Sequence, residues 1–261
     1  LGGNTGSYLG KPALMKEAEV FVGKLPNAKI EWLNLETAPA LKWADGKPVD
    51  QTVMDAWLRL ALKLKDPAGS PLFGLYFDQL DAASVTAFSD WVLRSWIAYD
   101  TWRPASDALR EKAHKQAVAD KAAGKMWYAQ SWTVDDITSY LLSMWTAGYP
   151  NSGSDAKGIL ALALRATPTS ATAAIAAYLK QHGKRVSQAK CLVEVLAAMG
   201  TPEALQVLVA TATRFKQRTV RELAEQRVGE IAEARGWTED ELADRSVPSG
   251  GFEEDGIMQL E

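Results

Sequence analysis

Apolar residues recur every three or four positions through most of residues 157–247, which predicts a succession of amphipathic helices. Thr167-Pro168, Thr201-Pro202 and Gly236-Trp237-Thr238 interrupt this pattern, and Thr167 and Thr201 lie 34 residues apart. A repeat of this length with two helices per unit is typical of an α-solenoid of the HEAT or a related class. We therefore expect helices at about 157–166, 169–182, 186–199, 202–214, 218–235 and 238–245.

The first 150 residues also favour helices, but in a less regular order. Gly and Pro recur through residues 1–50 and leave room only for short helices, such as one over 12–22. Residues 30–35 alternate between apolar and polar, which favours an extended segment lying along helices rather than in a sheet. Beyond this segment, apolar stripes predict helices over 50–65, 81–99, 105–123 and 133–145, with a loop over 69–74. The helix over 105–123 carries few large apolar residues, so we expect it to be outermost.

A change of composition divides the chain near residue 150. The segment 149–154 is rich in Gly, Ser, Pro and Asn and is the best candidate for a linker, and nine of the ten tryptophans lie at or before Trp145. The sequence therefore predicts an all-α protein with an irregular, Trp-rich helical region over 1–150 and HEAT-like helical repeats over 151–248. Residues 249–261 are expected to begin a linker to a further C-terminal domain, so that the chain is a piece of a larger protein.

Composition and charge exclude some classes of partner. The net charge of −3 gives no overall attraction to nucleic acid or to an anionic membrane, so such binding would need a local basic patch. A single cysteine, Cys191, excludes an internal disulfide and a zinc site built from cysteines, and it fits a reducing cytoplasm. No apolar run approaches the length of a membrane span. We expect a cytoplasmic protein with no cofactor, no metal and no membrane partner.

Residues with catalytic potential are few. His114 and His182 are far apart in polar surroundings and lack the helical spacing of a zinc motif, so we expect solvated histidines. Asp135-Asp136 follows Trp132, and HEAT-like DNA glycosylases place acids near tryptophans, but acidic residues also favour a helix N-terminus. Cys191 has no histidine in its own helix and is expected to pack as a small apolar residue.

The most informative polar feature is a pair of basic turns. Lys180, Lys184 and Arg185 surround the turn before residue 186, and Arg214, Lys216 and Arg218 surround the turn before residue 219. Positions 182 and 216 are 34 residues apart, so stacked repeats would place both turns on the same edge. The resulting basic ridge could bind nucleic-acid phosphates or an acidic partner. The alternative is that these cations only complement helix C-termini in solvated turns.

The tryptophans offer a possible ligand platform, but most fit a core. Helical spacing places Trp57, Trp91, Trp96 and Trp145 on apolar faces. The remaining candidates for exposure are those near breaks in the pattern, namely Trp43, Trp102, Trp127 and Trp132.

The C-terminal part resembles a known family. The sequence 233–245 (EARGWTEDELADR), followed by Val247-Pro248 and 254–256 (EDG), resembles a segment of large bacterial MolR-like proteins. Residues 196–200 (LAAMG) and 204–205 (AL) are similar to the helical repeat region of the same proteins. The resemblance covers about 155–261. It implies a structural signature beside a C-terminal domain of unknown function, a link to molybdate-dependent regulation, and in some relatives a WGR module. It assigns no catalytic or molybdate-binding residue.

These observations lead to a functional expectation. We expect a non-catalytic interaction or scaffolding module of a larger, regulatory bacterial protein, which binds a protein partner or the remaining domains of the same polypeptide. The alternatives are nucleic-acid binding through the basic edge and, less favoured, an enzyme of the HEAT-like DNA glycosylase type.

Overall fold

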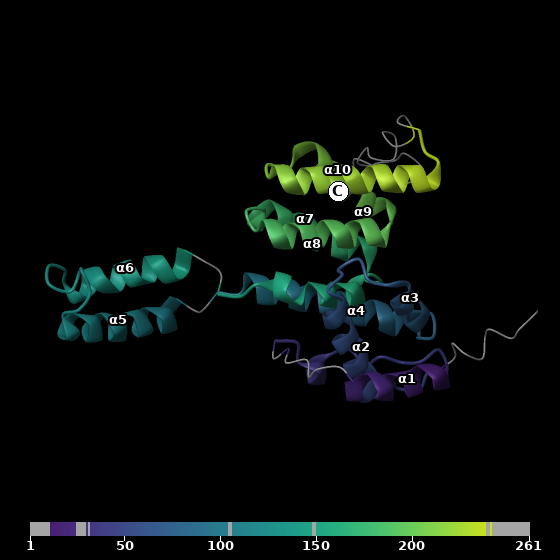
Figure 1. Ribbon diagram of the computed structural model, residues 1–261, viewed down its shortest axis with the longest axis horizontal. Coiled ribbons are helices and arrows are strands. Elements are labelled where there is room, and N and C mark those ends of the chain that lie inside the picture. Colours follow the sequence, from purple (N-terminus) through teal and green to yellow (C-terminus); the bar gives the residue numbers. More distant parts are fainter. Residues whose placement is uncertain are drawn as a thin grey trace, which may run out of the picture. The chain divides into compact units, whose positions relative to one another are not determined.

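The computed structural model describes residues 11–24, 30, 32–103, 106–147, 150–238 and 241, and over these residues the protein is all-helical, as predicted (Figure 1). No strand occurs in these ranges; two isolated bridges join Lys42 to Pro48 and Trp43 to Leu80. The helices are α1 Lys11–Lys24, α2 Gln51–Leu64, α3 Pro71–Phe77, α4 Ala82–Thr101, α5 Ser106–Ala123, α6 Val134–Ala147, α7 Pro168–His182, α8 Val186–Met199, α9 Pro202–Arg214 and α10 Arg218–Arg235, with 3₁₀ segments η2 Leu35–Thr37 and η3 Gly153–Ala163.

The chain forms two compact units that differ from the expected division at residue 150. Unit 1 combines residues 1–97 with 153–261, and unit 2 consists of residues 98–152. The first 97 residues therefore do not form a domain with residues 98–150. The sequence could not indicate this, because the contacts that join 1–97 to the later segment connect residues far apart along the chain.

The segment η3 provides those contacts. Residues 159–163 are completely buried, and the Ser89 hydroxyl donates a hydrogen bond to the Leu162 carbonyl oxygen at 2.8 Å. The Trp96 indole N–H donates to the carbonyl oxygen of Gly153 at 3.0 Å. Gly153 is therefore a buried part of unit 1 rather than part of a solvated linker, and the expected helix over 157–166 is instead a 3₁₀ segment that begins four residues earlier.

Close packing against α2 accounts for this segment. A Cβ atom at Gly158 would lie only 1.9 Å from the carbonyl oxygen of Ala61, so a glycine is required where η3 crosses α2. A second tether joins α4 to the start of α7, because Asp90 accepts hydrogen bonds from the backbone N–H and the hydroxyl of Thr167 at 3.2 and 2.7 Å.

Two local expectations about residues 30–80 are wrong. The described residues of this segment, 30 and 32–35, form a turn that leads into η2 rather than an extended segment: the N–H of Leu33 donates to the Ile30 carbonyl, and the Asn34 side chain caps η2. The expected loop over 69–74 contains the start of α3, because Ser70 accepts a hydrogen bond from the N–H of Leu72 and a proline follows at the first helical position. Three aromatic side chains of α3 are buried, namely Phe73, Tyr76 and Phe77.

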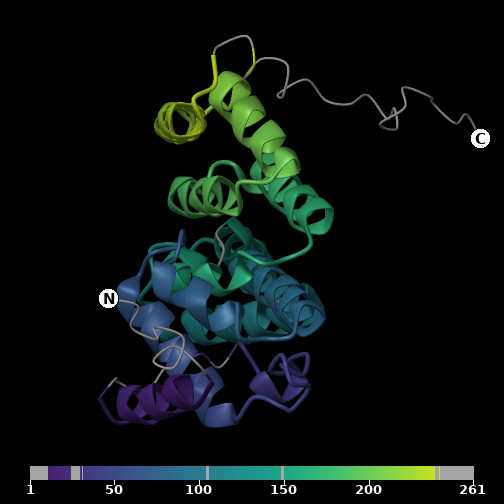
Figure 2. The same ribbon diagram turned by 90° about the vertical axis from the view of Figure 1, so that its right-hand side faces the viewer.

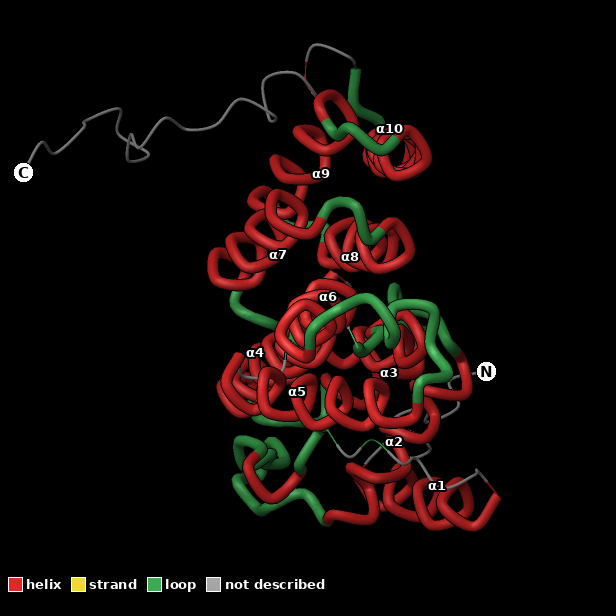
Figure 3. The backbone as a smooth tube through the Cα atoms, turned by 90° about the vertical axis from the view of Figure 1, so that its left-hand side faces the viewer, coloured by secondary structure: helices red, strands yellow, loops and turns green. Residues whose placement is uncertain are grey.

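The helices α7 to α10 agree with the expected spans to within one residue. Their ends carry local signals: Thr201 caps α9 by accepting from the N–H of Ala204, while Gly200 and Gly236 end α8 and α10 with positive φ angles of 61° and 65°. Figure 2 shows α7–α8 and α9–α10 as successive helical pairs, and Figure 3 shows α7 and α9 on one side with α8 and α10 on the other. Of the helix expected over 238–245, all but 238 and 241 lie outside the described residues.

Unit 2 contains a hairpin of α5 and α6 with its own small core. Most of α5 is exposed, and only Leu109, Ala113 and Ala117 are buried, which agrees with its expected thin apolar face. The rings of Trp127, Tyr128, Trp132 and Tyr140 contact one another over the connection between the two helices. Asp120 accepts a hydrogen bond from the Tyr128 hydroxyl at 2.6 Å, and this bond raises the pKa of Tyr128 to about 12.

Candidate functional site

The two basic turns predicted from the repeat lie against each other. A Cβ atom at Gly183, in the turn between α7 and α8, would be 2.9 Å from the ring of Phe215, in the turn between α9 and α10. The same atom would be 2.6 Å from the carbonyl oxygen of Leu179, so only glycine fits this position without rearrangement. The 34-residue spacing therefore corresponds to a real contact between the two turns.

We call the six predicted residues at these turns the basic edge: Lys180, Lys184, Arg185, Arg214, Lys216 and Arg218. Four of them, Lys180, Lys184, Arg214 and Lys216, are exposed and have no ion-pair partner among the described residues. Arg218 instead pairs with Glu222 at 2.7 Å, and Arg185 is half-buried. The basic edge therefore presents an excess of positive charge, although part of the predicted set is engaged within the protein.

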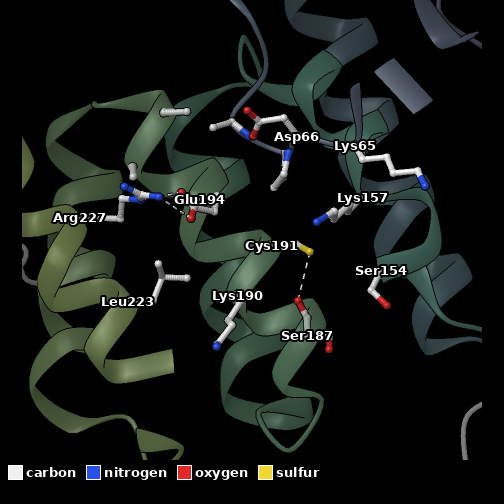
Figure 4. A pocket seen from close by; sticks show the side chains of 14 residues that line it. Lys65, Asp66, Ser154, Lys157, Ser187, Lys190, Cys191, Glu194, Leu223 and Arg227 are labelled. Carbon is white, nitrogen blue, oxygen red and sulfur yellow. Dashed lines mark hydrogen bonds and ion pairs between the residues drawn. The ribbon is translucent and has the colours of Figure 1, made fainter. Parts of the chain in front are cut away.

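A pocket that the sequence did not indicate lies on the side of α8 and α10 in unit 1. It has a volume of about 930 Å³. Its lining comes from the loop after α2, the start of η3, and α8 and α10 (Figure 4), with the side chains of Lys65, Asp66, Pro67, Ala68, Ser154, Lys157, Ser187, Lys190, Cys191, Glu194, Ala197, Ala198, Leu223 and Arg227. Ser187 lies two residues after Arg185, so the pocket begins next to the basic edge.

Three lysines give this pocket its positive charge. Lys65 ends α2 in a left-handed conformation (φ 55°), Lys157 belongs to η3, and Lys190 lies on the polar side of α8. None of the three side chains has a hydrogen-bond or ion-pair partner among the described residues. Lys65 is exposed, whereas Lys157 and Lys190 are half-buried. The carboxylate of Asp66 accepts from the N–H of Ala68 at 3.0 Å and forms no ion pair with them.

One wall of the pocket is an ion pair between α8 and α10. Arg227 binds Glu194 with one edge of its guanidinium, from Nε at 2.7 Å and from Nη2 at 2.9 Å (Figure 4). Its Nη1 atom pairs with Glu230. These hydrogen bonds raise the pKa of Arg227 above its ordinary value. Because this pair is partly buried and bidentate, it fixes the spacing of the two helices and leaves the lysines as the unpaired cations.

Cys191 also lines the pocket. Its side chain is buried, and its thiol donates a hydrogen bond to the carbonyl oxygen of Ser187 at 3.1 Å. No histidine lines the pocket. The thiol thus packs as the small apolar residue expected from the sequence.

In unit 2, His114 and Asp135 line one pocket of about 570 Å³ between α5 and α6, whereas His182 ends α7 in unit 1. His114 is exposed on α5, and the half-buried His182 ring lies 5.1 Å from the ring of Tyr178. Asp136 caps α6: its carboxylate accepts from the backbone N–H and the hydroxyl of Thr133 at 3.0 and 2.7 Å. Within the described ranges, no three His, Cys, Asp or Glu residues form a group able to bind a metal ion.

The cap on α6 leads to a testable prediction. Replacing Thr133 with alanine should lower the free energy of unfolding by about 1 kcal/mol, because α6 loses the Thr133 hydroxyl, which accepts a hydrogen bond from the N–H of Asp136 at 3.1 Å. The Thr133 hydrogen bonds lower the pKa of Asp136, so its stabilising contribution is present at neutral pH and is lost as the pH falls below the ordinary aspartate value. Thermal unfolding at neutral and acidic pH should therefore show a difference between the two proteins that shrinks in acid. A difference independent of pH would contradict the role of the Asp136 carboxylate.

The tryptophans agree only partly with expectation. Trp57 and Trp96 are buried as expected, Trp91 and Trp145 are half-buried, and Trp102 and Trp127 are exposed. Trp132 is half-buried within the ring cluster of unit 2. Trp43 was expected to be free for exposure but is only 2% exposed, because it packs edge-on against Trp57. Its burial depends on a partner 14 positions away that local pattern does not reveal.

The fold and the site define an all-α protein with stacked helical pairs, a basic edge and a lysine-lined pocket. Comparisons with protein-family models, with curated proteins and with solved structures find no significant match to this chain. None of the helices in the described part of the chain is both long and apolar enough to cross a membrane.

Proposed function

We propose that this chain is a non-catalytic interaction module of a larger bacterial protein and that it binds an acidic protein partner. The partner is a separate protein or another domain of the same polypeptide. The observation that supports the proposal is the contact between the two basic turns, which carry four cations without an ion-pair partner among the described residues. The HEAT-like repeat type, the MolR-like relationship, the regulatory role and the cytoplasmic location belong to the same proposal.

The distribution of charge supports binding rather than solubility alone. The chain as a whole carries a net charge of −3, yet the exposed cations of the basic edge lie together and lack carboxylate partners among the described residues. Such segregation attracts a partner of opposite charge and orients its approach. A non-catalytic role is favoured because the Cys191 thiol is hydrogen-bonded to a backbone carbonyl and the Asp136 carboxylate caps α6, which are structural roles.

Nucleic acid is the second candidate partner. The two turns in contact could place Lys180, Lys184, Arg214 and Lys216 along a phosphate backbone. If all four replaced condensed counterions on a duplex, the logarithm of the binding constant would fall with the logarithm of salt concentration with a slope of about −3 to −4. The slope of the binding constant against salt concentration therefore provides a measurable test for nucleic acid as the partner.

The experiment compares a poly-glutamate peptide with duplex DNA and single-stranded RNA. Fluorescence anisotropy with the full chain at about 50 and about 200 mM salt gives affinities and slopes. Replacing Lys180, Lys184, Arg214 and Lys216 with glutamate should weaken peptide binding by about tenfold or more. The matched control replaces four exposed lysines of residues 1–97 with glutamate, namely Lys16, Lys42, Lys47 and Lys63, and should leave the affinity nearly unchanged.

The outcomes separate the candidates. One outcome is that DNA or RNA binds more tightly than the peptide and with the steep salt slope, and that this binding is lost in the basic-edge variant but kept in the control. Nucleic acid would then be the partner instead of an acidic protein. An equal loss of affinity in both variants would mean that binding depends on the net charge of the protein and not on the basic edge. Absence of binding to every probe at low salt would contradict both candidates.

A further inference from the structure

The pocket lined by the loop after α2, η3, α8 and α10 combines lysines with apolar side chains, unlike the basic edge, which was defined by cations alone. We propose that it binds an acidic peptide segment in which apolar side chains separate the carboxylates. This inference deepens the proposed interaction function and rests on it, because it names the partner's binding segment.

Unpaired charge is the first argument. Lys157 and Lys190 are half-buried, and neither has a partner among the described residues. Partial burial holds their aliphatic stems against the protein, and their ammonium groups, which have no carboxylate partner there, can bind a negatively charged ligand. Arg227 does not compete for that ligand, because Glu194 and Glu230 already bind its guanidinium.

The placement of the lysines argues for several separate anionic groups. Figure 4 shows Lys65 and Lys190 at opposite sides of the pocket, with the Lys157 ammonium directed between them toward Cys191. A single phosphate could not meet all three, whereas carboxylates spaced along a peptide could. The volume of about 930 Å³ lies at the upper end of the range for small-molecule sites, which suits a segment of several residues.

The rest of the lining argues for apolar side chains between the carboxylates. Pro67, Ala197, Ala198 and Leu223 provide apolar surface in the same pocket. None of the described residues that line it is aromatic, so a nucleotide would find no ring among them on which to stack. The ion pair of Arg227 with Glu194 holds α8 and α10 in place before binding, which reduces the entropic cost of forming the complex.

The test uses a short fluorescent peptide with pairs of glutamates separated by leucines. The comparison probes are a peptide of equal charge with serines in place of the leucines, and inorganic tripolyphosphate. Replacing Lys65, Lys157 and Lys190 together with glutamine should weaken binding of the leucine peptide by about tenfold or more. The matched control replaces Lys16, Lys42 and Lys63 with glutamine and should change the affinity by less than about twofold.

A second measurement reports on the pocket of the unchanged chain. Cys191 is the only cysteine of the protein and lines this pocket, so its rate of reaction with a small thiol reagent is specific to the site. Bound leucine peptide should slow this reaction several-fold, and the serine peptide should protect less. This readout remains informative even if the triple variant does not fold.

Each outcome decides the proposal. If tripolyphosphate binds more tightly than the leucine peptide and protects Cys191 more strongly, the ligand of the pocket is a phosphate and the peptide proposal is wrong. If the peptide binds but leaves Cys191 unprotected, and if binding depends only on the basic edge, the pocket is not the binding site. The proposed function would still stand. If no acidic peptide binds anywhere, the proposed function fails together with this inference.

Discussion

Replacing Gly158 with alanine is expected to destabilise the protein by about 3 kcal/mol or more. The added Cβ atom would lie 1.9 Å from the carbonyl oxygen of Ala61 and 2.8 Å from its carbonyl carbon. It would also be 3.1 Å from the Cα atom of Lys65. These are backbone atoms of α2 and its C-terminal cap, so no side-chain rotation can relieve the overlap. The helix and η3 would have to move apart.

Urea or thermal unfolding followed by circular dichroism measures this effect. Gly229→Ala is the matched control, because Gly229 lies inside α10 and a Cβ atom there meets nothing within 4 Å. Alanine is the better helix former, so the control should be stabilised by about 0.5–1 kcal/mol. If the two substitutions had similar effects, η3 and α2 would not approach as closely as the structure indicates.

Replacing Trp96 with alanine is the second substitution with a large expected effect, a loss of about 3–5 kcal/mol. The side chain is fully buried and its ring lies 6.2 Å from the ring of Tyr178. Truncation leaves a cavity between α4 and α7 and removes the hydrogen bond to Gly153. Trp96→Phe keeps most of the apolar contact but leaves the Gly153 carbonyl without this donor, so its cost should be smaller, about 1–3 kcal/mol.

The same unfolding measurements test this ordering. Trp102→Ala provides the control, because the Trp102 side chain is 51% exposed, and its cost should stay below about 1 kcal/mol. A Trp96→Ala protein as stable as the Trp102→Ala protein would refute the burial of Trp96 in the core that joins residues 1–97 to 153–261.

The Gly158 substitution also links stability to the candidate site. Gly158 follows Lys157 and packs on the C-terminal end of α2, where Lys65 begins the loop that lines the pocket. Displacing η3 from α2 would therefore change the spacing between Lys65 and Lys157. Any Gly158→Ala protein that still folds should consequently lose affinity for the leucine peptide, whereas Gly229→Ala should not.

The sequence indicated the repeated helical pairs well because their signals are local. Thr201-Pro202 starts α9 through a side-chain cap and a proline at the first turn, and Gly200 ends α8 in a left-handed conformation. These features depend on a few neighbouring residues. The 34-residue spacing further predicted that the two basic turns would meet, and Gly183 does pack against Phe215.

The sequence failed where the outcome depends on distant partners. Residues 159–163 have a composition suited to an α-helix, but they belong to the buried 3₁₀ segment η3, which packs closely on α2 at Gly158. Trp43 precedes a glycine turn and was expected to be available for exposure, yet it packs on Trp57. Neither result follows from the neighbours of the residue in question.

The candidate site shows the same limit. Lys65 and Lys157 are 92 positions apart and belong to different kinds of element, and no spacing connects them to Lys190. The sequence alone determined the all-helical class, the limits of α7 to α10 and the adjacency of the basic turns, because caps and periodicity act over short distances. Only the tertiary structure decided which segments share a core and which lysines share a pocket, because long-range packing at Gly158 and Trp96 brings those segments together.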